Sequence, residues 1–228
     1  MMVSQSLEQG ADTRRRILQA ALSAFGHNDY DSVGIRRIVE AAGANIAAIS
    51  YHFGGKKGLY LATAAYLAEN LQAGMQQHLE RIAAATAGGD PAQCRRMLSE
   101  LVSRFAENLL TGALSDDAPG FIFREQNHPT DAFDILYEKL FRPMHETMAG
   151  LVACARSLPC DAEETRLVAH ALLGPAIAFR AARTTMLRHL SRPVYTASDV
   201  ARIKDLLALL TASALDYERR DAPPGEQP

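Results

Sequence analysis

Small, polar and aromatic side chains gather in one short segment near the N-terminus, where they could read the bases of a nucleic acid. In the expected helix IAAISYHF, Ile49 and Phe53 lie four residues apart and face inward together. The opposite face presents Ala47, Ala48, Ser50, Tyr51 and His52. Alanine suits contact with thymine methyl groups, and the hydroxyl and imidazole groups can hydrogen-bond to base edges in the major groove.

Basic side chains flank this segment and could hold phosphates. Lys56 and Lys57 begin the next helical pattern, where free backbone N–H groups and the helix dipole favour anions. Arg36 and Arg37 begin the preceding one. Residues 12–60 contain seven basic and four acidic residues, a net charge of +3, whereas the whole chain carries −2. A local basic patch that positions the protein on DNA is therefore expected, with sequence choice left to the neighbouring helix.

Three short helical patterns position these residues. The first covers 12–27, the second runs from Ile35 after Gly34, and the third follows a Gly43-Ala44 turn with Asn45 as its N-cap. Two helices joined by a glycine-containing turn form a helix-turn-helix. The alternative is a three-helix corner of an ordinary bundle with solvated charges. We prefer the first interpretation, because the small and polar face of the third helix is poor material for a core.

The rest of the chain also predicts helices. Hydrophobic residues make up 48% of the chain and β-branched residues rarely run together, which favours an all-α fold. We expect a flexible N-terminus at 1–11, a helix-turn-helix DNA-binding domain at 12–55, a helical effector-binding and dimerisation domain at 56–220, and a flexible tail at 221–228. In the larger domain we expect one long helix from Lys56 to the Gly88-Gly89 break, then helices at about 91–110, 119–126, 129–156, 161–190 with a kink at Gly174-Pro175, and 196–220.

The cysteines and the hydropathy pattern limit the cellular setting. Cys94, Cys154 and Cys160 are odd in number and form no CxxC pair, which predicts reduced thiols rather than a disulfide framework. No stretch reaches the roughly 20 apolar residues that a membrane span needs, and the N-terminus lacks the pattern of a signal peptide. We therefore expect a cytoplasmic protein that does not bind membranes.

The expected helix-turn-helix segment also resembles a known family. GANIAAISYHFGGKKGLY, preceded by GIRRIVEAA, resembles the helix-turn-helix signature of TetR-type, AcrR-like repressors, in which a Tyr-x-Phe pair is followed by a Gly/Ser-Lys turn. The resemblance implies a homodimer that binds a palindromic double-stranded DNA operator and is released by a small-molecule effector. The positions of the family's DNA contacts hold Asn45, Ile46, Ala47, Ser50, Tyr51, His52 and Lys56.

The chain departs from this signature at three positions. Gly34 stands where the family usually has a Ser or Thr that caps the second helix and touches a phosphate, although glycine is a tolerated N-cap. Ser50 replaces a frequent Tyr and Ala44 a frequent Val. Farther along, FIFREQNHPTDAFDILYEKLFRPM, residues 121–144, resembles the CecR-like subgroup of the family.

An effector pocket between helices should combine apolar walls with a few polar groups. The candidate ligand-binding residues are Phe105, Phe121, Arg124, Glu125, His128, Tyr137, His145, His170, Phe179 and Arg180. His170 also suits a hydrogen-bonded core position, and Arg124 with Glu125 also suits an ion pair. The last two long helices have wide apolar stripes that could pair with their copies in a four-helix dimer interface.

Two other classes of protein are weighed against a regulator. A helical-bundle enzyme should carry a recognisable motif, but the chain has no GxSxG, P-loop, GxGxxG or HExxH sequence. A metal-binding bundle should repeat a helical ligand spacing such as Glu-x-x-His, and the seven histidines do not. We therefore expect no catalytic residues, no metal ligands and no cofactor. A DNA-binding protein without an effector is a third alternative, and it would lack a fillable cavity in its body.

Overall fold

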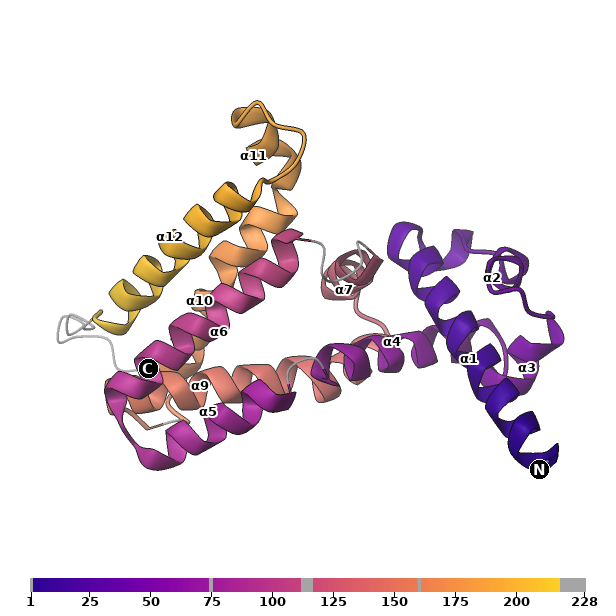
Figure 1. The fold of residues 1–228 in the computed structure, drawn as a ribbon, viewed down its shortest axis with the longest axis horizontal. Coiled ribbons are helices and arrows are strands. Elements are labelled where there is room, and N and C mark those ends of the chain that lie inside the picture. The colour runs from indigo at the N-terminus through magenta and orange to yellow at the C-terminus, as the bar shows by residue number, and fades with distance from the viewer. Residues whose placement is uncertain (1, 74–75, 112–116, 160, 218–228) are drawn as a thin grey trace, which may run out of the picture. The chain divides into compact units, whose positions relative to one another are not determined.

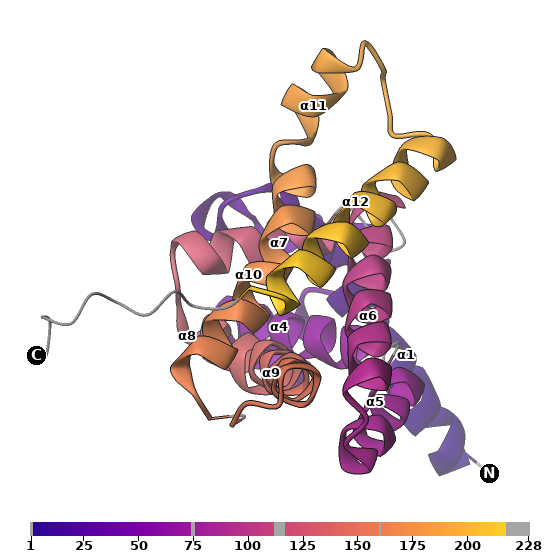
Figure 2. The same ribbon diagram turned by 90° about the vertical axis from the view of Figure 1, so that its left-hand side faces the viewer.

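A computed structural model describes residues 2–73, 76–111, 117–159 and 161–217, and every regular element in these ranges is helical (Figures 1 and 2). The expected all-α fold is confirmed. The elements, in chain order, are α1 (Met2–His27), η1 (Tyr30–Ser32), α2 (Ile35–Ala41), α3 (Ala47–Phe53), α4 (Lys56–Ala73), α5 (Gln76–Gly88), α6 (Pro91–Thr111), α7 (Asp117–Asn127), α8 (Asp131–Leu136), the π-helical turn η2 (Tyr137–Phe141), α9 (Arg142–Arg156), α10 (Glu163–Ala181), α11 (Arg183–His189) and α12 (Ala197–Leu215).

Several boundaries differ from those expected. Helix α1 begins at Met2, ten residues before the predicted start at Asp12, since the polar residues between them are mostly good helix formers. The long pattern from Lys56 is described as α4 and α5. Helix α10 continues through Pro175 and ends at Ala181, because buried residues on both sides of the proline hold it against its neighbours. The single helix expected at 161–190 is instead divided at Ala182, between α10 and α11.

The chain divides into two compact units. Unit 1 contains residues 1–78 and 112–144, and unit 2 contains 79–111 and 145–228. This division differs from the boundary at residue 55 expected above, because α4, α7, α8 and η2 pack with the three N-terminal helices. The helix-turn-helix therefore has a larger folded base than its own 44-residue segment.

One hydrophobic core holds unit 1 together. Apolar residues of α1, α2, α3 and α4 meet those of α7, α8 and η2. Helices α1 and α7 approach so closely that a Cβ atom built on Gly120 would lie 2.2 Å from the backbone oxygen of Gly26. Both glycines are therefore required by this crossing, because any side chain there would collide with backbone.

Helices α6, α10 and α12 pack side by side in unit 2 (Figures 1 and 2). A capping box begins α12: the Thr196 hydroxyl accepts a hydrogen bond from the Asp199 N–H, and the Asp199 carboxylate accepts from the Thr196 N–H at 2.9 Å. The hydrogen bonds from the backbone and the hydroxyl of Thr196, aided by Arg192, lower the pKa of Asp199 to about 2, although burial opposes the shift.

The prediction of reduced cysteines is wrong for two of the three. Cys94 on α6 and Cys154 on α9 are joined by a disulfide with their Cα atoms 6.1 Å apart, across a sequence separation of 60 residues. An odd cysteine count and the lack of a CxxC pair carry no information about helices that meet in space. Cys160 lies outside the described residues.

Candidate nucleic-acid interface

The turn between α2 and α3 presents α3 as expected of a helix-turn-helix. Gly34 is the N-cap of α2, as predicted. Gly43 adopts a left-handed φ of 58° that suits glycine. The N-cap of α3 is Ile46 rather than the expected Asn45, although the Asn45 side chain still accepts a hydrogen bond of 3.0 Å from the Ala47 N–H. Ile49 points into the core and is 1% exposed. These local contacts fix which face of α3 turns outward.

The outward face of α3 carries the residues proposed to contact bases. Tyr51 is 85% exposed and Ile46 is 51% exposed. Asn45, Ala47 and Ser50 are also exposed, while Ala48 and His52 are partly exposed. The His52 and Tyr51 rings lie edge to face, with centroids 4.8 Å apart. Small residues beside one projecting aromatic ring leave the helix backbone free to approach a surface closely.

Four cations surround this face. Arg36 and Arg37 are exposed in the first turn of α2. Lys56 lies over the Tyr30 ring at 4.5 Å and donates to the Asp31 carbonyl at 3.3 Å, which holds its ammonium group at the start of α4. Lys57 forms an ion pair of 2.7 Å with Asp131 of α8. That hydrogen bond and charge raise the pKa of Lys57 and lower the pKa of Asp131.

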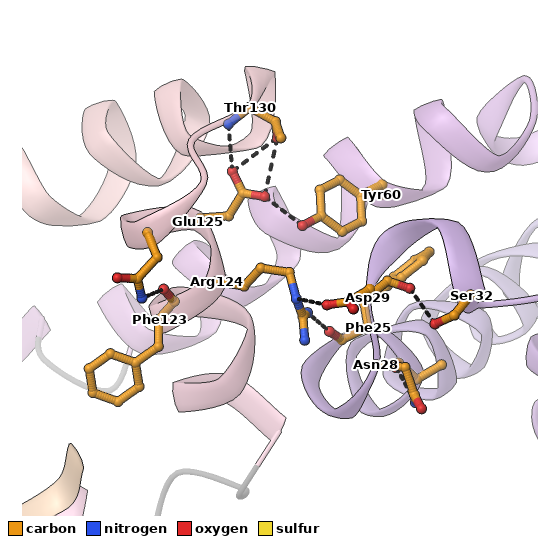
Figure 3. Close-up of polar contacts among 11 residues, drawn as sticks. Phe25, Asn28, Asp29, Ser32, Tyr60, Phe123, Arg124, Glu125 and Thr130 are labelled. Atoms are coloured by element: carbon orange, nitrogen blue, oxygen red, sulfur yellow. Dashed lines mark hydrogen bonds and ion pairs between the residues drawn. The ribbon is translucent and has the colours of Figure 1, made fainter. Parts of the chain in front are cut away.

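Two residues predicted to bind a ligand instead attach α7 to the rest of unit 1 (Figure 3). Arg124 donates to the backbone carbonyl of Phe25, near the C-terminal end of α1, and pairs with Asp29 at 3.4 Å. Glu125 is fully buried and accepts a 2.5 Å hydrogen bond from the Tyr60 hydroxyl of α4. Burial and this contact raise the pKa of Tyr60.

Thr130 completes the surroundings of Glu125 (Figure 3). Its backbone N–H donates to Glu125 Oε2 at 3.0 Å and its hydroxyl at 2.9 Å, while the same hydroxyl caps α8 by accepting from the Ala132 N–H. One carboxylate thus joins α4, α7 and the start of α8. Sequence reasoning missed Tyr60 and Thr130, since they lie 65 and five residues from Glu125 and no periodic pattern links the three.

The remaining ligand candidates fall in both units. In unit 1, Phe121 is fully buried, His128 is exposed and Tyr137 lies under the Arg142 guanidinium. In unit 2, His145 Nε2 and His170 Nδ1 approach to 3.0 Å between α9 and α10. Phe105, Phe179 and Arg180 are partly buried.

Two cavities open on unit 2, and none of the ten candidates lines either of them. One, of about 400 Å³, is lined by Glu163, Glu164, Leu167, Val168, Ala171 and Tyr217. The other, of about 450 Å³, lies between α6, α11 and α12 and includes Arg183, Tyr195 and Lys204. Within the described ranges no three His, Cys, Asp or Glu side chains gather as metal ligands would, and no helix there is long and apolar enough to cross a membrane.

Comparisons with known proteins agree with this arrangement. The family model for bacterial regulatory proteins of the tetR family matches residues 17–63, which contain the helix-turn-helix. The model for the C-terminal domain of the HTH-type transcriptional dual regulator CecR matches residues 94–216. CecR of Shigella flexneri is 34% identical over 184 residues, which cover 78% of this chain and 80% of CecR.

Solved structures share the fold. A TetR-family transcriptional regulator from Mesorhizobium loti superposes with a TM-score of 0.56 at 19% identity, covering 91% of this chain and 96% of its own. A TetR-family regulator from Agrobacterium tumefaciens reaches a TM-score of 0.58 at 16% identity, covering 87% and 97%. The similarity to CecR, a regulator of transcription, argues against the alternative of a helical-bundle enzyme. The chain belongs to the TetR family of bacterial transcriptional regulators, with a C-terminal domain of the CecR type.

Proposed function

We propose that this DNA-binding regulator reads a double-stranded operator with the outward face of α3. The main support for this proposal is that Tyr51 projects into solvent among small and polar residues, whereas Ile49, on the opposite side of the same helix, is buried. An α-helix with such a face fits the major groove. Gly34, Arg36, Arg37, Lys56 and Lys57 would contact phosphates, and Asn45, Ile46, Ala47, Ala48, Ser50, Tyr51 and His52 would contact bases and the adjoining backbone.

The exposed apolar face of unit 2 supports a homodimer. Leu206, Leu209 and Leu210 are large and exposed along one side of α12, and Leu167 is exposed on α10. Contiguous apolar side chains of this kind mark a protein interface. Pairing α10 and α12 with their copies would form a four-helix interface with two-fold symmetry, so the operator would be a palindrome with half-sites about 34–36 Å apart.

We infer that a small-molecule effector binds the helical body and releases the operator. In unit 2, His145 and His170 approach each other to 3.0 Å and offer polar groups, and Phe105, Phe179 and Arg180 are partly buried. A ligand can shift an equilibrium only if it binds one conformation more tightly. In unit 1, the attachment of α7 to α1 and α4 through Arg124 and Glu125 gives a route by which a movement of α7 would move the DNA-binding helices. DNA as the partner implies a cytoplasmic protein.

The test is selection of genomic fragments by the purified protein, followed by affinity measurements on the recovered operator. Tyr51→Ala should weaken binding at least tenfold without lowering the melting temperature. Arg36→Ala should weaken binding to all sequences and reduce the slope of log affinity against log salt by about two per dimer, as expected for one lost phosphate contact per subunit. Arg96→Ala, an exposed arginine of unit 2, is the matched control. Unchanged affinity in both head variants would refute the assignment.

The dimer has its own test. Leu209→Glu places a charge in the exposed apolar face of α12, where Leu209 is 64% exposed and makes few contacts within its own chain. We expect a folded monomer in analytical ultracentrifugation. A variant that still sediments as a dimer with the affinity of the parent protein would exclude this face as the interface.

A further inference from the structure

We propose that Cys94 and Cys154 form a reversible redox site through which oxidants change the operator affinity of this regulator. The proposal rests on the proposed function for its output, while its chemistry can be tested separately. The two Cα atoms lie 6.1 Å apart, inside the range of about 4.4–6.8 Å that disulfides require. The backbone positions of the two cysteines therefore suit a disulfide.

The setting of the pair favours reversible chemistry over a permanent cross-link. Disulfides that occur in cytoplasmic proteins are mostly transient and serve catalysis or redox sensing. Cys154 is partly exposed and so accessible to a small oxidant, whereas Cys94 is fully buried. Cys94 lies in the first turn of α6, within bonding reach of the Cys154 sulfur, so it is positioned to attack that sulfur once it is oxidised. One sulfur is placed to meet the oxidant and the other to complete the bond.

The step balances with hydrogen peroxide as the oxidant. The Cys154 thiolate attacks one peroxide oxygen, the O–O bond breaks, and a sulfenic acid and one water molecule result after protonation. The Cys94 thiolate then attacks the sulfenic sulfur and displaces hydroxide, which takes up a proton to give a second water molecule. Two thiols are oxidised to one disulfide as one peroxide is reduced to two waters. A dithiol reductant reverses the reaction by thiol–disulfide exchange.

The bond lies where several helix ends of unit 2 are tied together. Arg95, next to Cys94, donates to the Ala155 carbonyl at 3.4 Å and pairs with Asp216 at 2.6 Å. Arg156 follows closely after Cys154 in the chain; it donates to the Tyr217 carbonyl and pairs with Glu164. These contacts link the start of α6 and the end of α9 to α10 and to the end of α12.

Breaking the bond must move these elements. Two sulfurs that are no longer bonded separate from about 2 Å to roughly 3.5 Å or more, the distance of ordinary contact. Close packing passes such a shift on to neighbouring side chains. Helix α9 has its first residues in unit 1 and carries Cys154 in its last turn, so this continuous helix leads from the redox site to the unit that holds the DNA-binding helices.

The chemistry is tested first, on the full-length protein. Fully reduced protein is treated with hydrogen peroxide, and the products are followed by thiol titration and by mass spectrometry of peptides. We expect loss of two thiols, a linked peptide that contains Cys94 and Cys154, and full recovery with dithiothreitol. Cys160→Ser should behave like the parent protein. A linkage that involves Cys160 in the parent protein, or no linkage, would overturn the proposal without affecting the assignment as a DNA-binding regulator.

The effect of oxidation on operator affinity is tested next, with the operator fragment recovered by genomic selection. We expect the oxidised and reduced forms to differ in operator dissociation constant by at least fivefold, the lower range of allosteric coupling. Cys154→Ser and Cys94→Ser should lose this difference but keep the far-UV circular dichroism spectrum of the parent. A disulfide that forms while affinity stays equal would refute the switch. Failure of both forms to bind any DNA would instead refute the proposed function.

Discussion

Replacing Tyr60 with phenylalanine removes a single hydroxyl from the buried contact between α4 and α7. The Tyr60 hydroxyl donates a 2.5 Å hydrogen bond to Glu125, and both residues are almost inaccessible to solvent. The phenylalanine ring would keep its packing against Phe25 and Phe121, whose ring centroids each lie 4.9 Å from that of Tyr60. The substitution therefore tests the hydrogen bond with little change in packing.

The expected cost follows from what remains around the carboxylate. Glu125 keeps the two donors of Thr130 but loses the third. Leaving a buried acceptor short of a partner costs about 1–3 kcal/mol, because water cannot replace the lost donor. For a chain of this size, 2 kcal/mol corresponds to a fall of roughly 4–8 °C in melting temperature.

The assay is urea unfolding followed by circular dichroism, with differential scanning fluorimetry as a second measurement. Tyr66→Phe is the matched control, since Tyr66 lies on the same helix and makes no hydrogen bond through its hydroxyl in the described structure. Combining Tyr60→Phe with Glu125→Gln should cost less than the sum of the two single changes, because the residues share one contact. A loss below about 0.5 kcal/mol for Tyr60→Phe, the range of surface substitutions, would refute the reasoning.

Three further predictions concern other contacts. Gly120→Ala should unfold or strongly destabilise unit 1, because the added Cβ would collide with the backbone of α1. Gly150→Ala, whose Cβ would have no atom within 4 Å, should stabilise the protein by up to about 1 kcal/mol, and chemical denaturation measures both effects. Asp131→Asn frees Lys57 from its ion pair and should tighten operator binding and steepen its salt dependence, and an unchanged slope in fluorescence anisotropy would show that Lys57 makes no phosphate contact. The pKa of Asp199 is lowered to about 2, so its carboxylate should stabilise the fold fully above its ordinary pKa of about 3.9, and this stabilisation should be lost as the pH falls toward 2. The Asp199→Asn variant should be less stable than the parent at pH 7, and its melting temperature should change less with pH in this interval.

The DNA-binding helices could be predicted because the signals that define them are local. Gly34, Gly43 and Asn45 mark the ends of α2 and α3 through backbone conformation and short-range hydrogen bonds, and Ile49 marks the buried face through helical spacing. All of these interactions join residues a few positions apart. The sequence alone therefore determined the class of fold, the helix-turn-helix and the outward face of α3.

Only the tertiary structure showed what Arg124, Glu125 and the cysteines do. The contacts Tyr60–Glu125, Arg124–Phe25 and Cys94–Cys154 join residues 65, 99 and 60 positions apart, and each depends on which helices meet in space. Composition and periodicity show that a polar residue or a thiol exists, but not which partner faces it after packing. Long-range pairing is set by the burial of many side chains at once, and for that reason the base that holds the DNA-binding helices and the redox pair in unit 2 were decided by the folded chain.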